Sequence, residues 1–194
     1  MRTAILLLFA ILLHTFCNAQ PGPSGQDRQN EMPRSEKLMD RLLRMPDAML
    51  KKDITDIGEL KNMKVQLVKL TNLSDANMQF SLARFVYAYG DINSPNVKAV
   101  YTDVSAVDEM TRNFNMLQTK LFSEKSNVYS EIMFKTRDGI IGGCYWSKEG
   151  WAPYLKLADT DDSYVILGKD DFNKLMSMLD LMKSKLMPDP ARKK

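Results

Sequence analysis

The sequence predicts an α+β fold in which amphipathic helices pack on one face of a curved antiparallel sheet of about seven strands. Segments rich in β-branched and aromatic residues occur in consecutive groups, rather than alternating singly with helices. Segments with apolar residues at helical spacing follow these groups, and the last of them ends the predicted fold. These patterns favour one α+β domain over residues 35–188.

The first element of this domain is predicted to be a helix that begins at Ser35. Its apolar residues recur at helical spacing and are Leu38, Leu42, Met45 and Met49. Pro46 interrupts this pattern, so we expect a kinked or split helix. The segment also carries four basic residues, Arg41, Arg44, Lys51 and Lys52. Such a helix fits either a membrane surface or packing on the rest of the domain.

Three strands and a helix should come next. The strands are predicted over Met63–Thr71, Met78–Tyr89 and Val97–Thr102, with a hairpin loop between the first two. Ser105 is in position to cap the helix. The apolar face of this helix comprises Val107, Met110, Phe114, Leu117 and Leu121.

The second half of the domain reads as a four-strand antiparallel meander followed by a C-terminal helix. The turn Arg137-Asp138-Gly139 indicates a hairpin, because Asp-Gly readily adopts the positive φ that tight turns need. The helix is expected over Lys169–Leu186, with Asp170 and Asp171 in its first turn and Pro188 just after its end. The four strands are expected over Val128–Thr136, Ile140–Ser147, Trp151–Ala158 and Ser163–Leu167.

The N-terminus has the pattern of a secretory signal peptide over residues 1–19. Arg2 is followed by the apolar run Ala4–Leu13, and small residues end the segment at Ala19. The apolar run is too short for a permanent transmembrane anchor, and lipidation at Cys17 is disfavoured because Phe16 precedes it. We therefore expect a secreted or periplasmic protein, with a disordered leader at residues 20–34 and a basic tail at residues 189–194.

Cleavage would remove His14, the single histidine of the chain, and would leave Cys144 as its one thiol. Sites that need an imidazole within this chain are then excluded, and no catalytic, metal or cofactor-binding residues are assigned. The net charge of +3 is too balanced to indicate a nucleic-acid partner. The isolated Cys144 is expected to be a buried thiol.

The candidate ligand-binding residues are Tyr145, Trp146, Trp151 and Tyr154, which lie around one predicted hairpin. Neighbouring residues of a strand point to opposite faces, so Tyr145 and Trp146 cannot both lie in the core. An exposed aromatic side chain here would suit a sugar ring or a peptide. The alternative is that cross-strand aromatic pairs only stabilise the sheet.

Other patterns indicate chemistry less directly. Asp159–Ser163 spaces carboxylates as a calcium loop does, but Tyr164 stands where such loops need glycine, so a solvated turn is expected. Glu131 and Asp103 are single carboxylates without a partner specified by spacing. The sequence thus favours an exported non-enzymatic domain that binds a carbohydrate, a peptide or a cell-envelope protein. The alternatives are a carboxylate-dependent hydrolase acting on glycans and a carrier of lipids or other hydrophobic ligands.

Overall fold

The computed structural model describes residues 44, 47–75, 78–91, 94–157 and 163–187. Contacts within the chain separate Met1–Met32 from Pro33–Lys194, and all of the described residues belong to the second unit. The predicted signal peptide, leader and basic tail lie outside the described residues. So do most of the predicted first helix and residues 159–162 of the calcium-like segment.

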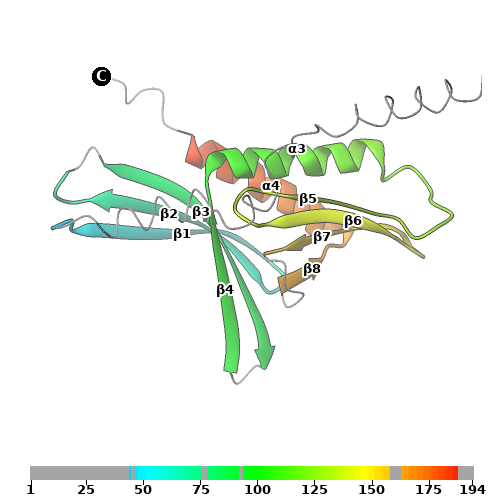
Figure 1. Cartoon of the computed structure of the whole chain (residues 1–194), viewed down its shortest axis with the longest axis horizontal. Helices are drawn as coiled ribbons and strands as arrows, with labels where there is room; N and C mark the ends of the chain where they lie inside the picture. Colours follow the sequence, from blue (N-terminus) through cyan, green and yellow to red (C-terminus); the bar gives the residue numbers. More distant parts are fainter. Residues whose placement is uncertain (1–43, 45–46, 76–77, 92–93, 158–162, 188–194) are drawn as a thin grey trace, which may run out of the picture. The chain divides into compact units, whose positions relative to one another are not determined.

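The described residues form two four-stranded antiparallel sheets, and a helix follows each sheet in the chain (Figure 1). The first sheet comprises β1 (Leu50–Leu60), β2 (Met63–Asn72), β3 (Gln79–Asp91) and β4 (Ser94–Thr102), followed by α3 (Val104–Lys120). The second comprises β5 (Glu131–Lys135), β6 (Ile141–Ser147), β7 (Gly150–Lys156) and β8 (Tyr164–Ile166), followed by α4 (Lys169–Leu186). Each sheet is a meander in which consecutive strands pair.

The α+β class, the antiparallel pairing and the C-terminal four-strand meander agree with the sequence prediction. The single sheet of about seven strands does not form, because the strands divide into two separate sheets at α3. The additional strand is β1, which includes Lys51 and Lys52 and pairs with β2 from Leu50 to Leu60. The prediction that Lys51 and Lys52 belong to a basic first helix is therefore wrong.

Both helices bury one face. The apolar residues Val107, Met110, Phe114 and Leu117 of α3 are buried as predicted. The cap of this helix is Asp103 rather than Ser105, since the Asp103 carboxylate accepts a hydrogen bond from the backbone N–H of Ala106 at 3.0 Å. On α4 the buried residues are Phe172, Leu175, Met178, Leu179, Met182 and Leu186. This stripe fits α4 against α3 and against strands β1, β2 and β3.

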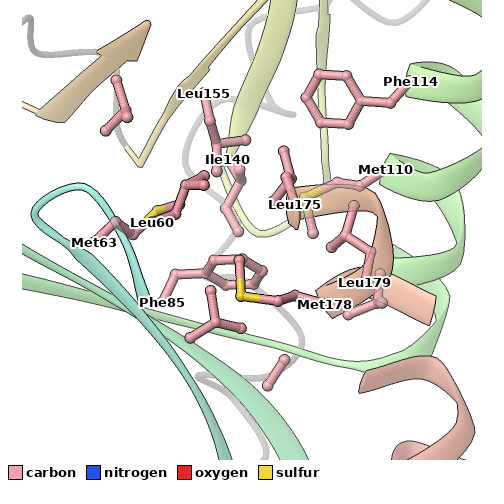
Figure 2. Close-up of a cluster of buried hydrophobic side chains, with 14 of the residues drawn as sticks. Leu60, Met63, Phe85, Met110, Phe114, Ile140, Leu155, Leu175, Met178 and Leu179 are labelled. Carbon is pink, nitrogen blue, oxygen red and sulfur yellow. The ribbon is translucent and has the colours of Figure 1, made fainter. Parts of the chain in front are cut away.

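One hydrophobic core joins these elements. Figure 2 shows side chains from both halves of the fold converging, with Phe85 of β3, Leu155 of β7 and Met110 of α3 among them. The helices therefore pack against residues of both sheets rather than closing each half separately. An ion pair between Asp108 of α3 and Lys183 of α4 lies beside the apolar contact of the two helices.

The face of the first sheet that carries Val68 and Leu70 has a smaller apolar cluster and a row of polar side chains. Gln66 donates to Asp56 at 2.7 Å, and Arg84 donates to Gln66 at 2.7 Å. The Arg84 guanidinium lies 5.7 Å from the centre of the Tyr101 ring. Because these four residues are direct cross-strand neighbours, the row spans β1 to β4 and stabilises their register.

Candidate functional site

The predicted aromatic hairpin forms between β6 and β7, and its four aromatic residues lie on two faces. Trp146 and Trp151 are direct cross-strand partners, with ring centres 5.5 Å apart in an edge-to-face arrangement. Tyr145 and Tyr154 occupy the opposite face, with ring centres 6.4 Å apart. The four residues therefore do not make one binding surface.

Trp151 is the less available of the two tryptophans. It packs against the hydrophobic core, and its indole N–H donates to the backbone carbonyl of Glu124 at 3.0 Å. This bond ties the hairpin to the segment that connects α3 with β5. Trp146 is half-buried and lines an open hollow of about 390 Å³. The other residues that line the hollow are Ser126, Asn127, Val128, Tyr129, Ser147 and Lys148.

The hollow forms where the chain before β5 leaves the strand ladder. The last rung is a hydrogen bond from the backbone N–H of Trp146 to the carbonyl of Ser130 at 2.8 Å. Before it, the hydroxyl of Ser126 donates to the carbonyl of Val128 at 2.8 Å and lies 2.9 Å from the hydroxyl of Ser130. These bonds hold a tight bend that leaves Val128 69% exposed and Tyr129 71% exposed. The hydrogen bonds of Ser126 and Ser130 thus shape one wall of the hollow.

The other wall is the turn between β6 and β7. The hydroxyl of Ser147 donates to the carbonyl of Gly150 at 2.7 Å and accepts from the backbone N–H of Glu149 at 3.2 Å. Gly150 has a φ of 115°, which this turn requires and which other residues rarely adopt. The turn places Lys148 at the rim of the hollow, where its ammonium group adds a hydrogen-bond donor.

On the opposite face, Glu131 accepts hydrogen bonds from two tyrosine hydroxyls. Tyr154 donates to one carboxylate oxygen at 2.8 Å, and Tyr129 donates to the other at 3.0 Å. Tyr154 is buried and stacks on Tyr164, with ring centres 4.7 Å apart. Burial and the neighbouring Glu131 both raise the pKa of Tyr154, and the hydrogen bond to Glu131 raises the pKa of Tyr129. Both hydroxyls therefore stay protonated at neutral pH.

The pair Gly142-Gly143 makes room for aromatic rings on both faces of β6. A Cβ atom on Gly142 would lie 2.4 Å from the ring of Phe134, and one on Gly143 would lie 2.8 Å from the ring of Tyr154. Cys144, the next residue, is buried as predicted, and loss of solvation raises the pKa of its thiol to about 11. A thiol in this state is a poor nucleophile.

Neither of the two single carboxylates considered from the sequence, Asp103 and Glu131, is placed for acid–base chemistry. Asp103 serves as the helix cap; although partial burial raises its pKa, hydrogen bonds from Ser105 and Ala106 lower it by more, so the group stays ionised. Glu131 is held by the two tyrosines. Among the described residues no group of three or more histidine, cysteine, aspartate or glutamate side chains is placed to hold a metal ion.

The residues that the sequence analysis missed are Val128 and Tyr129. They were assigned to the body of a predicted strand, whereas the described strand begins only at Glu131. The available signal was the pair Ser126 and Ser130, whose short polar side chains bend a backbone locally. No protein-family model and no curated protein sequence matches this chain. In the part of the chain that is described, the helices are too short or too polar to cross a membrane.

Proposed function

We propose that this chain is an exported, non-enzymatic binding domain that holds a saccharide in the hollow beside Trp146. The observation that carries the proposal is the half-buried indole of Trp146 in a hollow of about 390 Å³. The hollow is shallow and open to solvent, so it suits a ligand that is held on one face rather than enclosed. An aromatic ring fixed by its neighbours binds a flat apolar face of a ligand with little loss of entropy.

The polar groups around the hollow favour a hydroxyl-bearing ligand. Asn127 supplies an amide group and Lys148 an ammonium group beside Trp146, whereas the hydroxyls of Ser126 and Ser147 already donate to backbone carbonyls. A sugar ring offers one apolar face and a rim of hydroxyls, which matches this combination. A lipid chain would offer no hydrogen bond to Asn127 or Lys148, at a cost in free energy wherever it covered them.

The packing of the core also supports a surface ligand over an internal one. Around Gly142 the rings of Phe114 and Phe134 approach so closely that a single added methyl group would clash. The two rings lie edge to face, with centres 5.0 Å apart. This part of the interior leaves no room for an acyl chain, so we place the ligand at the hollow.

The binding test uses Trp146 as its own reporter. The tryptophan fluorescence of the wild-type protein is titrated with oligosaccharides of hexoses and of N-acetylhexosamines, and with a peptide library, and the part of the change that is lost in Trp146→Phe is assigned to Trp146. We expect at least one oligosaccharide to change the fluorescence, and Trp146→Ala to weaken binding about tenfold or more in calorimetry. The matched control is Val97→Ala, an exposed residue of β4 in the other sheet.

The saccharide proposal is wrong if no oligosaccharide binds, if only peptides bind, or if Trp146→Ala binds as tightly as the control. Export is tested separately, by measuring the mass of the protein recovered outside the cytoplasm of its source. We expect a chain that begins near Gln20. A protein retained with Met1 in the cytoplasm would contradict export without bearing on the hollow.

A further inference from the structure

Strand β5 forms an open edge of the second sheet and pairs, among the described residues, with β6 alone (Figure 1). Its hydrogen-bonding pattern follows from the rungs at its two ends. Trp146 donates to the carbonyl of Ser130, and Thr136 donates to the carbonyl of Ile140. In an antiparallel ladder such pairs alternate, so the even-numbered residues of this stretch bond to β6. The backbone groups of Glu131, Met133 and Lys135 consequently point away from β6.

The exposed edge of β5 has few of the features that prevent an edge strand from pairing with a strand of another molecule. Proteins commonly protect an open edge with proline, bulges, several charges or a very short strand. β8, at the other edge of the sheet, has three residues, whereas β5 has five and contains neither a proline nor a register shift. Its central residue, Met133, is 61% exposed, and Ile132 beside it is 38% exposed. An exposed apolar strand with outward backbone groups is suited to pairing with another strand.

The sequence of β5, Glu-Ile-Met-Phe-Lys, is complementary to itself in the antiparallel direction. When two copies pair with Met133 at the two-fold axis, Glu131 of each copy lies opposite Lys135 of the other. Opposite charges in directly facing positions stabilise a strand pair, and like charges destabilise it. A register shifted by two residues would place Glu131 opposite Met133, and a parallel arrangement would place like charges near each other. The Met133-centred register is therefore favoured.

From this pattern we propose that the chain forms a two-fold symmetric dimer through β5, in which the two second sheets join into one continuous antiparallel sheet. Residues whose backbone groups point outward face each other in this register, so the two Met133 residues form a hydrogen-bonded pair across the axis. The interface is isologous, because the same strand contributes from both copies. Contacts limited to one strand bury little area, so the dimer is weak and depends on protein concentration.

The first test measures mass in solution. Sedimentation of the wild-type protein over a range of concentrations should show a monomer–dimer equilibrium. Met133→Lys places two positive charges at the axis and should abolish the dimer. Met116→Lys, at a methionine of α3 that is 48% exposed, is the matched control and should leave the equilibrium unchanged. Met133→Pro should also abolish the dimer, while the monomer stays folded because this N–H does not bond to β6.

The second test reports on register. Facing residues of a hydrogen-bonded pair have Cα atoms about 5.5 Å apart, a separation that a disulfide spans. In a Cys17→Ser background, in which Cys144 is buried, Met133→Cys should form a covalent dimer on mild oxidation. Val97→Cys, at an exposed position of β4, should not. A wild-type protein that stays monomeric at every concentration, or Met133→Cys that cross-links no more than Val97→Cys, would overturn the proposal. Neither outcome bears on saccharide binding, which is read from Trp146.

Discussion

Replacing Gly143 with alanine should destabilise the protein through a clash that the neighbouring strand cannot avoid. The added Cβ would lie 2.4 Å from the carbonyl oxygen of Ile132, which is backbone, and 2.8 Å from Cζ and from the hydroxyl of Tyr154. Overpacking of this kind costs about 1 to 3 kcal/mol. Because the nearest atom belongs to a paired strand and cannot rotate away, we expect about 3 kcal/mol, or a fall in Tm of roughly 6 to 12 °C.

The measurement is guanidinium denaturation followed by tryptophan fluorescence and by circular dichroism. Gly168→Ala is the matched control, since its Cβ would meet only a side-chain oxygen of Asp171, at 3.5 Å. Because Gly168 is the N-cap residue of α4, where alanine is less favoured than glycine, we expect the free energy of unfolding of this control to fall by about 1 kcal/mol or less. If Gly143→Ala and Gly168→Ala unfold at the same denaturant concentration, the close approach of Tyr154 and Ile132 to Gly143 does not limit stability, and the reasoning fails.

Three further substitutions test other contacts. Asp103→Ala removes the cap of α3 and should lower the free energy of unfolding by about 1 kcal/mol in chemical denaturation; no loss would contradict the capping role. Lys183 lowers the pKa of Asp108 below 3.8. The ion pair of these two residues therefore stabilises the fold above pH 3.8, and this stabilisation is lost as the pH falls below 3.8. The Tm of the wild type should therefore fall more steeply in acid than that of Asp108→Asn; parallel curves would exclude the effect. Glu131→Gln removes the charge that raises the pKa of Tyr154, so tyrosinate absorbance should appear at lower pH, and an unchanged titration would contradict the contact.

The helices and turns of the second half could be predicted because their signals are local. The bounds of α4 match the prediction at both ends, since acidic residues begin the helix and an apolar stripe runs to Leu186. The Asp-Gly turn before β6 could likewise be predicted from a local signal, because Gly139 readily adopts the positive φ, here 85°, that the turn needs. Neither inference required knowledge of which elements meet in space.

Strand β1 and the division into two sheets could not be predicted in this way. β1 is an edge strand with a register shift between Asp56 and Gly58, and most of its side chains are exposed, so no clear alternation of apolar residues marks it. Helical spacing up to Met49 then favoured a helix through Lys52. Strand patterns also do not specify partners, so the sequence, which does place a helix between β4 and β5, could not show that these two strands belong to separate sheets. The burial of Tyr154 depends on its pairing with Gly143, which is a property of register.

Glu131 lies close to the tyrosine hydrogen bonds, to the hollow beside Trp146 and to the proposed dimer contact. A substitution at Glu131 can therefore test these three features separately. Its carboxylate accepts bonds from Tyr129 and Tyr154, its neighbour Ser130 makes the last rung with Trp146, and its charge faces Lys135 of the second copy in the proposed dimer. A carboxylate has about four acceptor positions, so the dimer contact does not require the tyrosine bonds to break. Glu131→Gln removes the charge and keeps one acceptor oxygen for one of the two tyrosines, while the other carboxylate oxygen is replaced by an NH2 donor. It should therefore weaken the dimer while the ring of Trp146 and the hollow beside it stay in place.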